Sequence, residues 1–363
     1  MISTRRINSV TFVVAVVLVI AVLSLTGCNK GTPDSAGASP GQDNRGSEEV
    51  ASGPRKKVLF VDSYHKGYPW SEGIISGMLE ELRITLDQND IASASDGTVE
   101  LKIVRMDTKR NTSEEFITQA AWKTKTVIDS WKPDLVIVAD DNASKYVVVP
   151  YFRNTEIPFV FCGVNWDCST YGFPCSNVTG MLEVSLIPQL LKEMGKFASG
   201  PRIGLLGADN LSNHKEANNY RSKFNVCLEK EVFVETFEEW KSAFKRLQSE
   251  VDMLIIAPPS FLKTTREKAQ AAKFVAEHTA VPTGCVEDWI TPYALIGFVK
   301  ASDEQGQWAG RTALKILAGR SPVDIPVVTN TKARIYLNMP IAKKLRVVFP
   351  MKLIESAELV TSE

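Results

Sequence analysis

The chain has 363 residues, enough for two ordinary domains, and 44% of them are hydrophobic while 23% are charged. It carries 42 basic and 42 acidic residues, so its formal net charge is +0. Because no overall field favours a polyanion, the composition gives a nucleic-acid-binding role no support.

The N-terminus has the three parts of a secretory signal. A short basic segment, "MISTRR", precedes the apolar run 10–25, which is short for a membrane span and typical of a signal-peptide core. The run ends in "LTGC", which resembles the lipobox of bacterial lipoproteins. That resemblance implies that residues 1–27 are removed and that Cys28 is lipidated, with the folded part outside the cytoplasmic membrane. The alternative is an uncleaved anchor with an incidental cysteine.

Residues 28–54 form a polar segment rich in Gly, Ser, Pro, Asp and Asn. Such a segment buries too little apolar surface to fold, so we expect a flexible tether with a reach of about 30 Å. It contains "GASPG", a formal match to a hydrolase nucleophile motif, but no strand precedes it and no helix follows it.

From Lys57 onward, short apolar runs alternate with amphipathic helical patterns. The clearest helix is expected to begin at Thr112, with Glu115 completing a capping box, and another begins near Trp70. The alternation predicts an α/β fold with two doubly wound parallel-sheet lobes. The expected strands are 57–63, 99–105, 134–139, 157–163, 202–207, 231–236, 252–257 and 281–286.

Polar and aromatic residues gather directly after these strands. In open α/β sheets the loops at the carboxyl ends of the strands bind ligands. We therefore expect ligand-binding roles for the following residues: Tyr64, His65, Tyr68, Asp140, Asp141, Asn142, Asn165, Trp166, Asp209, Asn210, Ser260, Glu287, Asp288 and Trp289.

Three stretches, 157–184, 296–327 and 334–350, resemble the ABC transporter substrate-binding proteins of the tryptophan/tyrosine type. The resemblance implies a type I periplasmic-binding-protein fold, whose two lobes close around a small ligand and deliver it to a permease. It implies one lobe of 55–165 plus 296–322 and another of 166–295 plus 323–363. The hinges would lie near 165–178, 288–298 and 320–328.

Two features depart from that pattern. Asp140 and Asp141 replace the small-residue loop of many relatives, and the longer first loop, "SYHKGYPW", is similar to extracellular sensor domains. A sensor input for a separate membrane signalling partner is therefore the alternative to transport.

The excess of acids among the candidates predicts a ligand with an ammonium group, and the aromatic rings predict a flat or apolar part. An aromatic or related amino acid fits both, and sugars are the main rival. Some residues of these loops have simpler interpretations: Asp141 or Asn142 could cap a helix. Trp70, at the start of the helix after the first loop, could pack beside Ile74 and Met78.

Cysteine chemistry and catalysis receive little support. Cys168 and Cys175 share one loop and are a candidate disulfide, whereas Cys162 and Cys285 lie in apolar strands and are expected to be buried thiols. No spacing suits zinc, and no phosphate-binding loop or nucleophile motif stands in the required context. We therefore expect a monomeric binding protein with no enzymatic activity, no metal and no cofactor.

Overall fold

The computed structural model describes residues 55–86, 91–93 and 97–361. The expected signal peptide, the lipidated Cys28 and the tether lie outside the described residues. Within the described ranges, no helix combines the length and the apolar character needed to cross a membrane.

The first sheet has seven strands in the order β12-β6-β5-β4-β1-β3-β2, all parallel to their neighbours except β2. Its strands are β1 (Lys56–Asp62), β2 (Ile91–Ser93), β3 (Val99–Arg105), β4 (Leu135–Ala139), β5 (Phe159–Asn165), β6 (Val178–Glu183) and β12 (Val328–Thr329). The buried residues of β1 alternate between the two faces: Val58 and Phe60 belong to one hydrophobic cluster, Leu59 and Val61 to another. The sheet is therefore covered on both sides.

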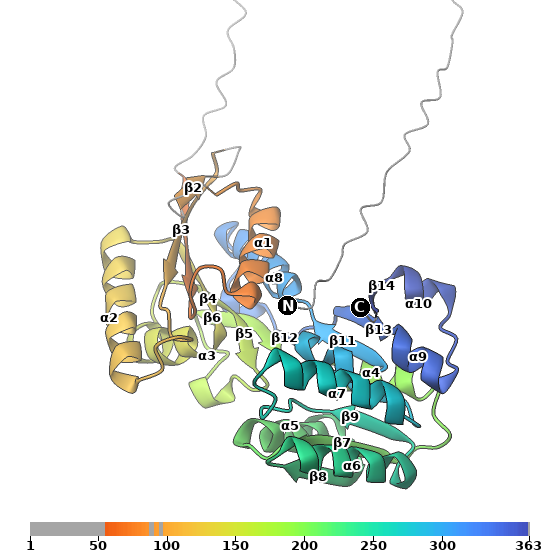
Figure 1. Cartoon of the computed structure of the whole chain (residues 1–363). Coiled ribbons are helices and arrows are strands. Elements are labelled where there is room, and N and C mark those ends of the chain that lie inside the picture. The colour runs from red at the N-terminus through yellow and green to blue at the C-terminus, as the bar shows by residue number, and fades with distance from the viewer. Residues whose placement is uncertain (1–54, 87–90, 94–96, 362–363) are drawn as a thin grey trace, which may run out of the picture. The chain divides into compact units, whose positions relative to one another are not determined.

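Helices α1 (Pro69–Leu82) and α8 (Ser302–Leu317) cover one face of this sheet side by side (Figure 1). The other face is covered by α2 (Glu114–Trp131) and by a π-helix, Ser144–Phe152, that continues the short helix α3 (Asp140–Ala143). A Cβ at Gly306 would lie 1.8 Å from the Ile74 carbonyl oxygen, and one at Gly77 would lie 2.2 Å from the Asp303 carbonyl oxygen. Glycine at both positions lets the α1 and α8 backbones approach closely, so α8 packs on the first sheet although strands of the second sheet precede and follow it in sequence.

The second sheet has the order β14-β13-β11-β10-β9-β7-β8, with one antiparallel pair, β11 with β13. Its strands are β7 (Ile203–Ala208), β8 (Leu228–Val234), β9 (Met253–Ile256), β10 (Thr283–Cys285), β11 (Ile296–Lys300), β13 (Ala333–Asn338) and β14 (Ala357–Val360). The accompanying helices are α4 (Ile187–Met194), α5 (Leu211–Phe224), α6 (Phe237–Glu250), α7 (Thr265–His278), α9 (Met339–Leu345) and α10 (Met351–Glu355). Trp240 and Phe244 on α6 are fully buried in its core.

All eight expected strands form, and β3 has the expected bounds. The helix expected at Thr112 begins at Glu114, because the Ser113 side chain accepts a hydrogen bond from the Phe116 amide at 3.3 Å. The expected capping box is therefore wrong. The buried residues of this helix are Ile117, Ala120, Ala121, Thr124 and Ile128.

The chain passes between the two sheets three times: after Glu183, after Lys300 and after Thr329. The crossings are bonded to one another. Asn330 Oδ1 accepts a hydrogen bond from the Val184 amide at 2.7 Å, and the buried Glu304 carboxylate accepts from the amide of Thr331 at 2.9 Å. These contacts form a three-stranded connection between the lobes.

The crossings differ from the lobe boundaries expected from the sequence. Strand pairing assigns 178–183 and 328–329 to the first sheet and 296–300 to the second. Gly180 explains why β6 lacks the run of large apolar residues that marks the other strands: a Cβ there would lie 2.3 Å from the Phe161 ring. Because β12 has only two residues, its sequence carries almost no strand pattern.

Candidate functional site

Asp140 lies at the carboxyl end of β4 in a left-handed conformation, with φ of 69°. Its side chain is buried, and the residue is 2% exposed. Oδ1 accepts a hydrogen bond from Trp70 Nε1 at 3.0 Å, whereas Oδ2 is buried and has no hydrogen-bond partner among the described residues. Burial raises the pKa of Asp140 well above its usual range, and the nearby carboxylates of Glu183 and Asp62 raise it further. In the part of the chain that the structure describes, no cation forms an ion pair with this carboxyl group.

Asp141 is only half-buried and holds two neighbours in place. Its Oδ2 accepts from Asn165 Nδ2 at 2.7 Å, and its Oδ1 accepts from the Tyr171 hydroxyl at 2.8 Å. Asn142 donates from Nδ2 to Thr108 Oγ1 at 2.8 Å. No side chain caps α3, so the helix-capping alternative for Asp141 and Asn142 is wrong. The structure brings Asp141 and Asn165 together, as their positions at neighbouring strand ends predict.

The first loop places aromatic rings beside these acids. Tyr64 and Tyr68 meet edge to face with ring centroids 5.0 Å apart, and His65 lies 5.6 Å from Tyr68. The Lys109 ammonium lies over both tyrosines, 4.9 Å from the Tyr64 centroid and 5.2 Å from that of Tyr68. Burial raises the pKa of the Tyr64 phenol, and the Asp140 and Glu183 carboxylates raise it further. Tyr64 and Asp140 thus follow the ends of two paired strands, since Asp62 of β1 pairs with Ala139 of β4.

A second group of charges lies where the chain crosses between the sheets. Lys300, at the end of β11, places its ammonium 2.7 Å from Glu183 Oε1 and 3.4 Å from Glu287 Oε1. The Lys300 and Glu183 side chains are 14% and 10% exposed. Burial lowers the pKa of Lys300, but the two carboxylates outweigh this effect and raise it overall. Burial raises the pKa of both Glu183 and Glu287 in spite of Lys300, so one ammonium serves two desolvated acids.

Trp166 packs against the second lobe. Its Nε1 donates to Glu216 Oε1 at 2.7 Å, and its ring lies 6.2 Å from Tyr220 and 5.7 Å from Phe224, all on α5. The backbone φ of 60° at Trp166 turns the chain after β5. Its indole is thus held by the second core, separate from the tyrosine pair.

The expected residues of the second lobe form two smaller groups. Asn210 caps α5 by accepting from the Asn213 amide and donates to Ser260 Oγ at 3.3 Å, while Asp209 lies 2.7 Å from His214 Nε2. Asp288 accepts from the Trp289 amide at 2.7 Å, and Trp289 is 51% exposed.

The cysteines are free thiols in the described part of the chain. Cys168 Sγ lies 3.5 Å from the Phe173 carbonyl oxygen, and Cys175 Sγ lies 3.4 Å from Asn177 Oδ1, so the two sulfurs have different partners. The expected disulfide is absent from the structure, whereas Cys162 and Cys285 are buried as expected. Among the described residues, no group of three or more His, Cys, Asp and Glu side chains is arranged to hold a metal ion.

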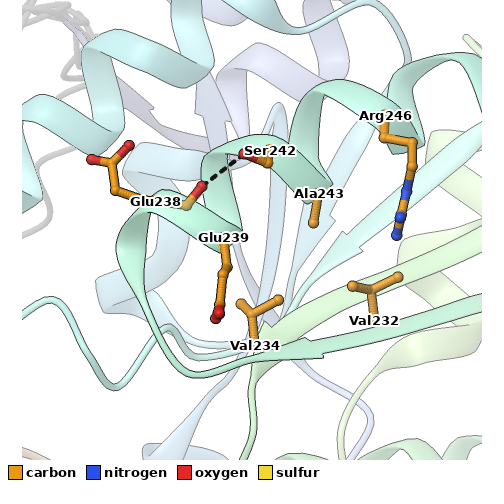
Figure 2. Close-up of a pocket in the computed structure, with 7 residues that line it drawn as sticks. All are labelled: Val232, Val234, Glu238, Glu239, Ser242, Ala243 and Arg246. Atoms are coloured by element: carbon orange, nitrogen blue, oxygen red, sulfur yellow. Dashed lines mark hydrogen bonds between the residues drawn. The ribbon is translucent and has the colours of Figure 1, made fainter.

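A hollow of about 460 Å³ lies elsewhere, between the edge strand β8 and helix α6. Figure 2 shows the residues around it. The hollow is lined by Val232, Val234, Glu238, Glu239, Ser242, Ala243 and Arg246. None of these residues is among the polar and aromatic groups at the strand ends. We therefore place the candidate site at the carboxyl ends of the strands.

Sequence reasoning missed four contributors to this site. Glu183, Lys300, Tyr171 and Lys109 lie in segments that single-sequence patterns assign to loops or describe poorly. The available signal was a lysine directly after the apolar run "IGFV", because a charged residue that continues an apolar strand is seldom placed in a core without a partner.

Residues 93–361 match the family described as ABC transporter substrate binding protein. Among solved structures, a ligand-free, open substrate binding protein with adhesive properties from Clostridium difficile has a TM-score of 0.64 at 20% identity, covering 85% of this chain and 100% of that chain. An ABC domain in complex with L-Trp from Streptococcus pneumonia has a TM-score of 0.50 at 17% identity, with coverages of 85% and 100%. No curated protein matches this chain significantly in sequence. The similarity in fold confirms the type I periplasmic-binding-protein architecture.

Proposed function

Because this chain belongs to the family of ABC transporter substrate-binding proteins, we propose that it captures a small ligand with an ammonium group and passes it to a membrane permease. An aromatic amino acid is the ligand that we favour. The protein would act by binding alone, outside the cytoplasmic membrane and without enzymatic activity. The family match favours transport over the alternative of a sensor input.

The observation that carries the ligand proposal is that the site contains more buried carboxyl groups than cations to pair with them. Asp140, Glu183 and Glu287 all have raised pKa values because they are buried, and Lys300 is the cation that pairs with two of them. Asp140 Oδ2 is left without a partner among the described residues. An incoming ammonium would stabilise the ionised acids, and these acids would in turn offset the loss of its hydration.

The aromatic part of the ligand proposal rests on the tyrosine pair. Tyr64 and Tyr68 lie edge to face, and Tyr64 is close enough to Asp140 and Glu183 for their charges to raise its pKa. Ring faces next to acids suit a molecule that combines a planar group with a cation. Neutral sugars would stack on the same rings, but they would leave the acids without a counter-charge.

The proposed mechanism is hinge closure. The three crossings are bonded to one another through Asn330 and Glu304, so rotation of one lobe would be concentrated in these short segments. A ligand held by both lobes would shift the equilibrium toward the closed form, which a permease could distinguish from the open form.

The test is a thermal-shift screen of the full chain in detergent against amino acids, amines and sugars, followed by calorimetric titration of each compound that binds. A ligand at 100 times its dissociation constant adds about 2.7 kcal/mol to the free energy of unfolding. Asp141→Asn should weaken binding at least about tenfold, because it removes a half-buried negative charge from the strand ends where the ammonium is proposed to bind. Asp129→Asn, at an exposed pair on α2, is the control and should leave affinity unchanged. Binding of a neutral sugar with no effect of Asp141→Asn would contradict the proposal.

We further propose that Cys28 anchors the protein to the cell envelope through lipid. Mass spectrometry of the membrane-extracted protein should show residues 1–27 removed and a lipid mass on Cys28. Cys28→Ser should release the protein into the aqueous phase of a detergent partition. Retention of Met1, or unchanged partitioning of Cys28→Ser, would rule out lipid anchoring at this residue.

A further inference from the structure

Lys109 holds a positive charge over the tyrosine pair without an acidic partner. Its ammonium lies 4.9 and 5.2 Å from the ring centroids of Tyr64 and Tyr68, and no carboxylate of the described residues forms an ion pair with it. We propose that Lys109 is a specificity-determining residue that binds a carboxylate of the ligand, so that the site selects amino acids over amines of the same shape. The inference rests on the proposed function and deepens it.

The backbone fixes Lys109 beside the first loop. Beyond the ends of β1 and β3, the amide of Met106 donates to the Asp62 carbonyl, that of Asp107 to Tyr64, and that of Thr108 to Ser63, at 2.8 to 3.0 Å. These bonds continue the sheet register into the two loops. Lys109 therefore comes directly after a segment whose backbone is hydrogen-bonded to the loop that contains Tyr64.

The neighbouring cation is already neutralised, which distinguishes it from Lys109. Arg110 binds Asp107 through both Nε and Nη2, at 2.7 and 2.6 Å, and the Asp107 carboxylate also lies 3.7 Å from His65 Nδ1. The Arg110 pair lowers the pKa of Asp107, so this acid stays ionised and committed to its own partners. The Lys109 charge is thus available to an anion that comes from outside the chain.

Tyr64 joins this cation to the acids. Lys109 lies over the Tyr64 ring. Tyr64 and Asp140 follow the ends of the paired strands β1 and β4, where Ser63 Oγ donates to the Ala139 carbonyl at 2.5 Å. A cation and an acid therefore lie on either side of the Tyr64 segment. An amino acid carries an ammonium and a carboxylate on one carbon, so a ligand stacked beside Tyr64 could satisfy the acids and Lys109 together. A simple amine would satisfy only the acids.

The experiment compares each ligand with a version that lacks the negative charge. The full chain in detergent is titrated with L-tryptophan, L-tyrosine and L-phenylalanine and with the amide of each, which keeps the ring and the ammonium. Wild-type protein should bind the preferred acid roughly tenfold to a hundredfold more tightly than its amide. Lys109→Met should remove this preference by weakening the acid alone, and Lys109→Arg should keep most of it, since arginine also stacks on rings.

Lys245→Met is the matched control, because its ammonium lies 5.3 Å from the Phe274 ring in the second lobe and, among the described residues, forms no ion pair. This substitution should change neither the affinity for the amino acids nor the affinity for their amides. If Lys109→Met weakens acid and amide equally, or leaves the preference intact, Lys109 does not bind the carboxylate. If wild type binds amides as tightly as acids, the inference fails while the proposed ammonium site stands. If wild type binds none of these compounds, the inference fails together with the proposal that the ligand is an aromatic amino acid. Thermal unfolding of each variant shows whether it is folded.

Discussion

Lys300→Met is expected to lower the free energy of unfolding by about 3–5 kcal/mol at neutral pH. Lys300 is 14% exposed and forms ion pairs with Glu183 at 2.7 Å and with Glu287 at 3.4 Å. Methionine has a similar length but no charge, so the variant would leave two carboxylates partly desolvated without their ammonium. Because Glu183 lies on the first sheet and Lys300 on the second, the loss would also weaken the connection between the lobes. Urea-induced unfolding of the full chain measures the change.

An exposed lysine in an ion pair of the same length provides the control. Lys196 lies 2.7 Å from Glu193 and is 51% exposed, so Lys196→Met should cost no more than about 1 kcal/mol. Adding Glu183→Gln to Lys300→Met should recover part of the loss, since it removes one of the uncompensated charges. Equal effects of the two lysine substitutions would show that the Lys300 pair is as well solvated as a surface pair.

The strands of the two sheets could largely be predicted from the sequence, because burial on both faces requires continuous apolar runs. The runs at 58–61 and 135–139 are fully buried, as their composition predicts. Such an apolar run predicts a strand but does not show which strands pair with it. The strand β6 contains Gly180, because a larger side chain there would collide with the Phe161 ring. The glycine interrupts the apolar run, so the sequence of β6 predicts a strand only weakly.

The candidate site could be predicted only in part. Asp141 and Asn165 follow neighbouring strands, so their contact at 2.7 Å follows from parallel topology. The pairing of Lys300 with Glu183 joins residues 117 positions apart in sequence (300 minus 183) on different sheets, and it depends on where the chain crosses. The position of Lys109 over the tyrosines depends on hydrogen bonds between two loops, which carry no periodic signal.

Asp140 combines burial with an unpartnered oxygen, and the direction of its pKa shift fixes the sign of its pH dependence. Its pKa is raised in the folded protein above a value of about 3.9 in the unfolded chain. At pH values between the unfolded and the folded pKa, Asp140 is protonated in the native state and ionised in the unfolded chain. The free energy of unfolding therefore falls as the pH rises, by about 1.4 kcal/mol per pH unit. The stabilisation is complete below the unfolded pKa and is lost as the pH rises through the folded one.

Asp140→Asn should remove this dependence, because asparagine is uncharged throughout and its Oδ1 can still accept the hydrogen bond from Trp70. We expect wild type to lose stability relative to Asp140→Asn on going from pH 4 to pH 7, by at least about 1.4 kcal/mol. Urea unfolding of both proteins at several pH values measures the difference. Asp129→Asn, at an exposed position of α2, should differ from wild type by less than about 0.5 kcal/mol across the same range.

A constant difference between wild type and Asp140→Asn would mean that Asp140 is ionised in the folded protein and that a counter-charge reaches its buried oxygen. In that case the surplus of acid that supports a cationic ligand would be smaller than the geometry indicates.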